Sequence, residues 1–247
     1  MKLLRLLPNT LTLANLACGA IASYHIAHSF DETSAVYLIF LAALFDLFDG
    51  AAARKLGVNG DMGRELDSLA DVVSFGLAPS LIIFSMLEQS LDAALQPLKY
   101  IAFANVLAAA YRLARFNVSE STGKTFNGMP SPANGIFWAS LLAIIVESNH
   151  PAMLPSDHWV WPTNLVFTFL VITTLLMISQ VEMFSLKFKP GGITANKTQT
   201  VFAIIGVVLS ISVYALFANW LFIIPILILL YIVTSVATFI WKSNGGN

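Results

Sequence analysis

Apolar stretches about as long as a membrane is thick constrain this sequence more than any other feature. Because the hydrocarbon core of a bilayer is about 30 Å thick, a helix needs about 20 mostly apolar residues to cross it. Eight stretches approach this length, the fifth being the shortest. They are residues 9–28, 34–54, 63–87, 97–117, 133–147, 160–183, 198–217 and 220–241.

Composition favours the same interpretation. Hydrophobic residues make up 57% of the 247-residue chain and charged residues only 11%, whereas about a quarter of the residues in a soluble domain are charged. The sequence therefore predicts an all-α fold, a polytopic transmembrane helical bundle of about eight spans that forms one integral membrane domain over residues 1–247.

Basic residues predict the orientation of the bundle, because Lys and Arg gather on the cytoplasmic side of membranes. With a cytoplasmic N-terminus, twelve of the thirteen basic residues fall on that side, and only Lys99 lies near the other. The twelve are Lys2, Arg5, Arg54, Lys55, Arg64, Arg112, Arg115, Lys124, Lys187, Lys189, Lys197 and Lys242. We therefore expect a multi-pass protein of the cell (cytoplasmic) membrane with both termini cytoplasmic. No basic cluster indicates a nucleic-acid partner.

Four carboxylates interrupt this apolar background between residues 46 and 71. At about 100° per residue, one face of the second predicted helix carries Asp46, Asp49, Gly50, Ala53 and Arg54. The next helix carries Gly63, Asp67 and Asp71 in one stripe, at positions i, i+4 and i+8. A short turn containing glycines joins the two helices and makes them antiparallel. The carboxylates are therefore predicted to converge near the cytoplasmic face.

Converging carboxylates repel one another unless a cation lies between them, and oxygen-only ligands suit Mg²⁺ or Mn²⁺. The pattern predicts a site for divalent cations, most simply two, which can clamp phosphates during an in-line displacement. The small residues on the same faces leave room for a bulky substrate. The alternatives are a solvated acidic loop and, in another class of protein, a membrane cation transporter. Against the transporter, the acidic residues gather near one side of the membrane and leave no acidic path across it.

The pattern D-x2-D-G-x2-A-R-x8-G-x3-D-x3-D resembles, at every defined position, the signature of the CDP-alcohol phosphotransferase family. The resemblance implies an integral membrane enzyme that moves a phosphatidyl or similar group from a CDP-linked donor to an alcohol and releases CMP. It also implies a homodimer. We expect the catalytic core over about residues 5–217 and a packing role for the last spans, which carry almost no polar chemistry. In this reading Asp46, Asp49 and Asp67 hold the metal ions, whereas Asp71 shares a metal and acts as the base. The donor then lies against Gly50, Ala53, Arg54 and Gly63.

Three further segments resemble that family. The first span opens Pro8-Asn9-x-x-Thr12-x-x-Asn15, which suits either helix capping or contact of Asn9 and Thr12 with the nucleotide. The runs R-L-A-R-F-N at 112–117 and F-x-G-x-P-S-P-A at 126–133 are similar to the branch that makes phosphatidylserine, although Met129 replaces its usual Leu. Arg112 and Arg115 are either anchors at the membrane surface or ligands for a serine carboxylate or a phosphate.

The resemblance thus predicts transfer of the phosphatidyl group from CDP-diacylglycerol to the hydroxyl of L-serine, which gives phosphatidylserine and CMP. The alternative within the family is another acceptor, such as glycerol 3-phosphate or inositol phosphate. A phosphorylated acceptor is expected to demand more basic residues around the pocket.

Overall fold

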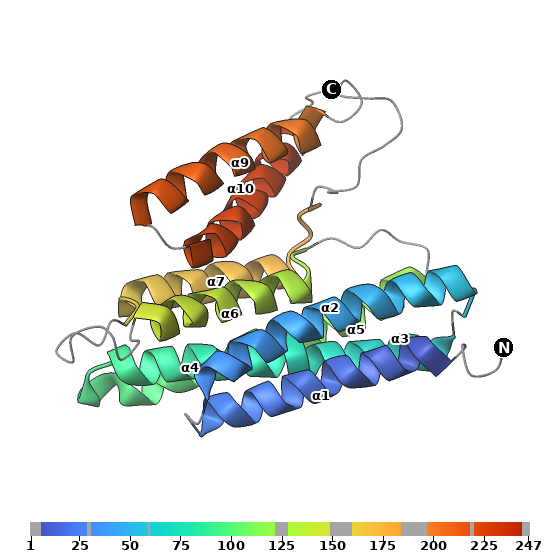
Figure 1. Ribbon diagram of the computed structural model, residues 1–247, viewed down its shortest axis with the longest axis horizontal. Helices are drawn as coiled ribbons and strands as arrows, with labels where there is room; N and C mark the ends of the chain where they lie inside the picture. The colour runs from blue at the N-terminus through green and yellow to red at the C-terminus, as the bar shows by residue number, and fades with distance from the viewer. Residues whose placement is uncertain are drawn as a thin grey trace.

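The structure, a computed structural model, describes residues 6–28, 31–58, 60–121, 128–148, 160–183, 197–217 and 220–243. These residues form helices and no strand (Figure 1). The α-helices are α1 (Leu7–Ala27), α2 (Glu32–Leu56), α3 (Asp61–Asp71), α4 (Ala78–Ser90), α5 (Ala104–Ser121), α6 (Ser131–Ser148), α7 (Thr163–Ile178), α9 (Lys197–Phe217) and α10 (Ile223–Ser243). Shorter elements are the π-helical turn η2 (Val72–Leu77) and the 3₁₀ segments η3 (Ala93–Phe103) and η4 (Trp220–Phe222). The all-α prediction is confirmed.

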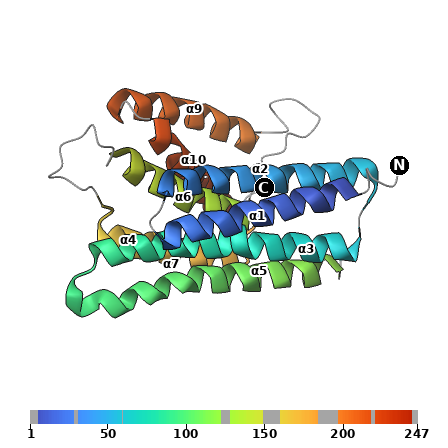
Figure 2. The same cartoon turned by 60° about the horizontal axis from the view of Figure 1, so that its bottom comes forward.

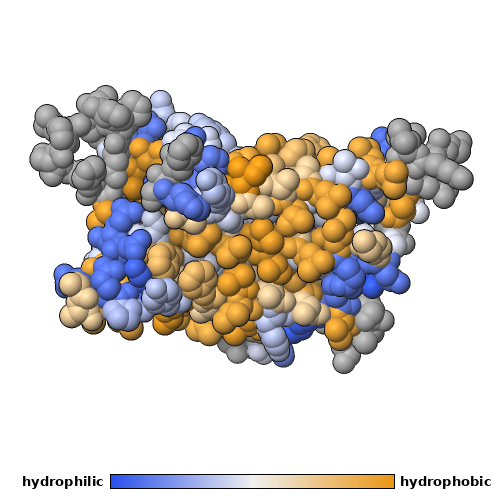
Figure 3. All heavy atoms as spheres, turned by 90° about the horizontal axis from the view of Figure 1, so that it is seen from below, coloured by the Kyte–Doolittle hydropathy of each residue, from blue (hydrophilic) through white to orange (hydrophobic). Residues whose placement is uncertain are grey.

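Five helical segments of the described chain are long and apolar enough to cross a membrane. They are Glu32–Leu56, Asp61–Ser90, Ala93–Val118, Gln199–Leu216 and Trp220–Ser243. Helices lie at all eight predicted stretches, but the count of eight spans and the cytoplasmic position of the termini stay predictions. Lys2, Arg5, Lys124, Lys187 and Lys189, which contribute to that orientation, lie outside the described residues. Figure 3 shows an apolar band across one face of the molecule, with polar side chains toward both ends.

Large apolar side chains form the core between the helices. The most deeply buried ones include Ile39 on α2, Ile82 and Leu87 on α4, and Phe137 and Trp138 on α6. Because these helices are hydrophobic nearly all round, they bury some apolar side chains against one another and expose others, as expected of helices in lipid. α10 packs against both α6 and α9, and so joins α9 to the rest of the bundle (Figures 1 and 2).

The chain between α1 and α2 reverses at Asp31, which caps α2. Asp31 Oδ1 accepts a hydrogen bond from the backbone N–H of Ser34 at 2.9 Å, and its Oδ2 accepts one from the Ser34 hydroxyl at 2.5 Å. These bonds, the side-chain one first, lower the pKa of Asp31 below its usual range. The cap starts α2 so that α1 and α2 lie side by side over their lengths (Figure 2).

Two details differ from the predicted stretches. The stretch 63–87 is not one α-helix, because the π-helical turn η2 separates α3 from α4. The stretch 160–183 holds a shorter helix, since α7 ends at Ile178 and the following backbone is extended at Ser179. There the N–H groups of Gly128 and Met129 donate to the carbonyls of Val181 and Leu176, at 2.8 and 3.0 Å. The segment that leads into α6 therefore satisfies backbone groups at the end of α7.

Candidate active site

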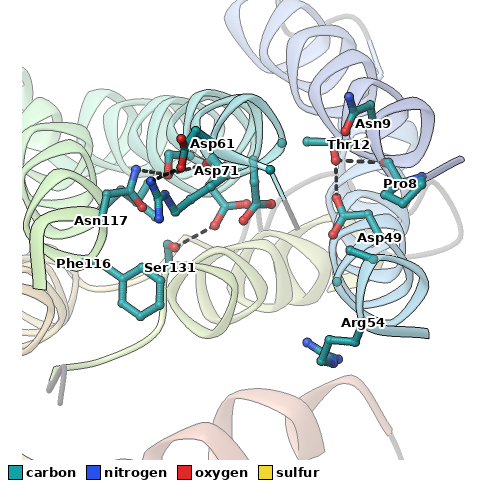
Figure 4. Close-up of a pocket in the computed structure, with 18 of the residues that line it drawn as sticks. Pro8, Asn9, Thr12, Asp49, Arg54, Asp61, Asp71, Phe116, Asn117 and Ser131 are labelled. Atoms are coloured by element: carbon teal, nitrogen blue, oxygen red, sulfur yellow. Dashed lines mark hydrogen bonds and ion pairs between the residues drawn. The ribbon is translucent and has the colours of Figure 1, made fainter. Parts of the chain in front are cut away.

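A cavity of about 630 Å³ opens where α1, α2, α3, α5 and α6 meet (Figure 4). Its walls include most residues that the sequence pattern singled out: Asn9, Thr12, Asp49, Gly50, Ala53, Arg54, Gly63, Asp67, Asp71 and Arg112. The predicted convergence of the two halves of the acidic motif is thus present in the structure. Its origin is the tight connection between α2 and α3, where Gly57 adopts a left-handed conformation with φ of 63°.

Three carboxylates come together on one side of this cavity. Oxygen atoms of Asp46, Asp49 and Asp67 all lie within 4.8 Å of one another, although Asp46 itself is not part of the cavity lining. Asp49 is 6% exposed, and its Oδ2 accepts a hydrogen bond from the Thr12 hydroxyl at 2.6 Å. Thr12 thereby fixes the orientation of one carboxylate from the neighbouring helix α1.

The same three side chains fit a hard divalent cation. Within the described residues, Asp67 Oδ1 is buried without a hydrogen-bond partner, and such an orphaned oxygen is costly unless another group satisfies it. Three acidic groups packed this closely also repel one another. A bound Mg²⁺ or Mn²⁺ would remove both costs, since these ions prefer carboxylate oxygens.

Asp71 lies close enough to Asp46 and Asp67 for their charges to repel, and it has hydrogen-bond partners of its own. It is 5% exposed, its Oδ2 accepts a hydrogen bond from the Ser131 hydroxyl at 3.1 Å, and its Oδ1 accepts one from Asn15 Nδ2 at 3.4 Å. Arg112 Nη1 in turn donates to Ser131 Oγ at 3.3 Å. Figure 4 shows Asp71 and Ser131 on one wall and Asp49 with Thr12 on the other. Beside the three grouped carboxylates the site therefore has a fourth, Asp71, which Asn15 on α1 and Ser131 on α6 orient.

Arg115 occupies a different place from Arg112. It does not belong to the cavity lining, and its Nη1 donates to the carbonyl of Ile178 at 2.9 Å, at the end of α7. A cation near the C-terminal end of a helix also favours the helix dipole. Arg112 alone of the pair faces the cavity, close to Asp71.

Several residues in or beside the site were not predicted as part of it. Asn15 and Ser131, the two partners of Asp71, stand inside the motifs quoted above, and Asn15 follows Thr12 by three positions on the same helical face. On the cavity wall, Asn117 Nδ2 donates to Ser68 Oγ at 3.0 Å. Their positions within the motifs are the signal that could have identified Asn15 and Ser131.

Fold and cavity together define a helical membrane protein with an acidic pocket suited to divalent cations. The sequence model of the CDP-alcohol phosphatidyltransferase family matches residues 5–240. The chain belongs to this family and is an enzyme of its class.

The curated relatives of the chain are named for one specific reaction within this family. The chain is 39% identical over 156 residues to CDP-diacylglycerol–serine O-phosphatidyltransferase of Bacillus subtilis, an alignment covering 60% of this chain and 79% of that protein. Proteins of the same name from Mycobacterium leprae and Helicobacter pylori are 30% and 29% identical over 188 and 181 residues. These alignments cover 73% and 72% of this chain, and 58% and 72% of the relatives.

Proposed function

We propose that this enzyme transfers the phosphatidyl group of CDP-diacylglycerol to the hydroxyl of L-serine and releases CMP. The observation that carries the proposal is the arrangement of the four carboxylates: three are grouped closely enough to hold cations, and Asp71 beside them accepts hydrogen bonds from Ser131 and Asn15. The serine acceptor is supported by the names of the relatives and by the sequence runs around Arg112 and Ser131.

Asp46, Asp49 and Asp67 are proposed to hold the divalent cations, two as the family resemblance suggests. When bound, such cations neutralise charge on the diphosphate of the donor and on the departing CMP. The role of Thr12 is to hold Asp49 in place through the 2.6 Å hydrogen bond. Gly50, Ala53 and Gly63 line the same cavity without large side chains, which leaves space for the nucleotide, with Asn9 and Arg54 beside it.

Asp71 is proposed as the base. The serine oxygen forms a bond to the phosphorus of the phosphatidyl group, the bond from that phosphorus to the CMP oxygen breaks, and the serine hydroxyl proton passes to Asp71. Ser131 and Asn15 donate to different oxygens of Asp71, which fixes the plane of its carboxylate. Arg112, held by the hydroxyl of Ser131, is placed to bind the serine carboxylate beside the base.

The cavity favours serine over a phosphorylated acceptor. Its described basic wall residues are Arg54, Arg64 and Arg112, and Arg64 Nη2 already pairs with Asp61 Oδ1 at 2.9 Å. The donor's diphosphate needs positive charge as well. Little is then left for the dianionic phosphate of glycerol 3-phosphate or inositol phosphate.

The test is CMP release by the purified enzyme from CDP-diacylglycerol, with serine, glycerol 3-phosphate or inositol phosphate as acceptor. We expect release with serine only, abolished by a chelator and restored by Mg²⁺ or Mn²⁺. Release that prefers another acceptor would assign the enzyme to a different activity of the same family. Serine-dependent release that persists after complete metal removal would contradict the role of the three carboxylates.

A further inference from the structure

The π-helical turn η2 begins directly after Asp71 and joins the helix of the site to a helix of the core. α3 carries Asp67 and Asp71 on its cavity face, whereas α4 buries Ile82, Ile83 and Leu87 among other helices. A π turn closes hydrogen bonds over five residues instead of four, as the bond from the Ala78 N–H to the Val73 carbonyl shows. One extra residue in the turn rotates α3 by about 100° relative to α4. η2 therefore sets which face of α3 meets the cavity.

Two backbone carbonyls of η2 accept hydrogen bonds from side chains of other helices. Pro79 has no N–H to give to the carbonyl of Phe75, four residues earlier. Asn134 on α6 supplies a donor, with its Nδ2 at 3.3 Å from the Phe75 oxygen. The Gly76 carbonyl accepts from Ser80 Oγ of α4 at 2.8 Å and from Asn105 Nδ2 of α5 at 3.1 Å.

The side-chain amides of Asn134 and Asn105 also form a hydrogen bond with each other. Asn134 Nδ2 donates to Asn105 Oδ1 at 3.0 Å, so both of its donors are used and its orientation is fixed. Both asparagines are 0% exposed. Asn134 Oδ1 has no hydrogen-bond partner within the described residues, but both N–H donors of this amide are satisfied only in this arrangement of the helices. Neither residue lines the cavity. They act on a turn that starts one residue beyond the carboxylate proposed as the base.

Neighbouring helices approach η2 too closely to let it shift freely. A Cβ atom on Gly135 would lie 2.7 Å from Cδ1 of Phe75, and one on Gly19 would overlap Ser74. Ser74 Oγ donates to the carbonyl of Asn15 at 2.9 Å, and Asn15 is itself a partner of Asp71. The turn thus connects α1, α5 and α6 to the base within one network.

We propose that Asn134 and Asn105 are positioning residues: by holding the π-helical turn they fix the rotation of α3, and with it Asp67 and Asp71 relative to Asp46 and Asp49. The proposal rests on the proposed function for its link to turnover. Its geometric part concerns metal binding and does not depend on which alcohol is the acceptor.

The experiment compares Asn134→Ala and Asn105→Ala with Ser140→Ala. Ser140 is a matched control because it is buried on the same helix as Asn134 and its hydroxyl donates within that helix, to the Phe137 carbonyl. Mn²⁺ binding to each purified full-length protein is measured by electron paramagnetic resonance without substrates. Turnover is then measured per metal-loaded protein at saturating CDP-diacylglycerol and serine, with melting temperature as a separate measure of folding.

We expect either Asn variant to weaken Mn²⁺ binding about tenfold and to lower kcat on the order of 10- to 100-fold, as a displacement of about 1 Å in a catalytic group can do. Ser140→Ala should change neither. Because the two amides act on one turn, the double variant should bind Mn²⁺ little worse than either single variant.

Wild-type Mn²⁺ affinity and kcat in the folded fraction of Asn134→Ala would overturn the proposal, even with a lowered melting temperature. If Asn134→Ala does not accumulate, the same two measurements on Asn105→Ala decide the question. Failure of the serine activity itself would show as absent turnover in the wild-type enzyme, while the Mn²⁺ comparison would still test the positioning role.

Discussion

At the scale of single residues, Asp71 and the three grouped carboxylates should differ in what their loss removes. Asp71→Asn keeps the shape of the side chain, and the Ser131 hydroxyl can rotate to accept from the new amide. An amide cannot take the serine proton, so turnover should fall by about 10²–10⁴-fold while donor binding survives. Serine kinetics and CDP-diacylglycerol binding without serine measure the two effects. Loss of donor binding would instead assign Asp71 to the metal ions.

Asp49→Ala should remove Mn²⁺ binding and activity together, because it deletes one of three ligands and leaves the Thr12 hydroxyl with only the Pro8 carbonyl as acceptor. Titration with Mn²⁺, followed by the CMP-release assay, checks this. The thermal stability of the metal-free protein should not fall in parallel, since removing a carboxylate relieves repulsion among the three. Metal-dependent turnover that survives in this variant would exclude the site.

Arg112→Lys should weaken the binding of serine. The substitution keeps a positive charge but loses the planar fork that binds a carboxylate through two hydrogen bonds. We expect a raised KM for serine with little change in CDP-diacylglycerol affinity. An effect on the donor alone would place Arg112 at the lipid phosphate. Arg115→Lys serves as a comparison, because Arg115 contacts the end of α7 and does not line the cavity.

The spacing of Asp46, Asp49 and Asp67 was enough to predict their grouping, because helical periodicity and one short turn determine it. The partners of Asp71 were harder to predict. A single Asn or Ser in an apolar helix, such as Asn15 or Ser131, has the same local pattern whether it packs between helices or orients a carboxylate. Only the contacts between α1, α3 and α6 distinguish the two.

At the scale of elements, the connection of α6 to the end of α7 depends on Gly128. Its φ of 103° is strained for other residues, and a Cβ there would lie 2.8 Å from the Met177 carbonyl oxygen. Gly128→Ala should therefore destabilise the folded protein by about 1–3 kcal/mol, measured as a lower melting temperature. Gly57→Ala is the control: its φ is 63°, but its Cβ would meet nothing within 4 Å. If the two substitutions lowered the melting temperature equally, the positive φ alone, and not the contact with the Met177 carbonyl, would account for the loss of stability.

The helices were predictable because apolar runs and their ends are encoded locally. The π turn and the early end of α7 were not, since both depend on donors from distant segments. Asn134 satisfies Phe75, and Gly128 and Met129 satisfy carbonyls beyond residue 175. Residues 72–77 contain no local pattern that predicts the π turn, and Pro79 just after them is the one local signal.

At the scale of the whole molecule, the excess of Lys and Arg predicts that the cavity opens to the cytoplasm. Single cysteines at Leu98 and Lys55, both exposed, can test this in a Cys18→Ala background. An impermeant thiol reagent outside intact cells should label Leu98→Cys and leave Lys55→Cys unmodified. After lysis both should react, which controls for accessibility. Labelling of Lys55→Cys alone in intact cells would invert the orientation.

Within the part of the chain that the structure describes, the residues that line the cavity run from Pro8 to Pro132, and this has a consequence for biosynthesis. Chains emerge from the ribosome N-terminal end first, so these lining residues are translated before α7. The segment bearing Ser131, however, is braced by backbone hydrogen bonds to Leu176 and Val181. In a nascent chain the four carboxylates can therefore come together before α7 is synthesised. The segment that carries Ser131, which orients Asp71, is held in place only after α7 has folded. We therefore expect the active site to be completed late in folding.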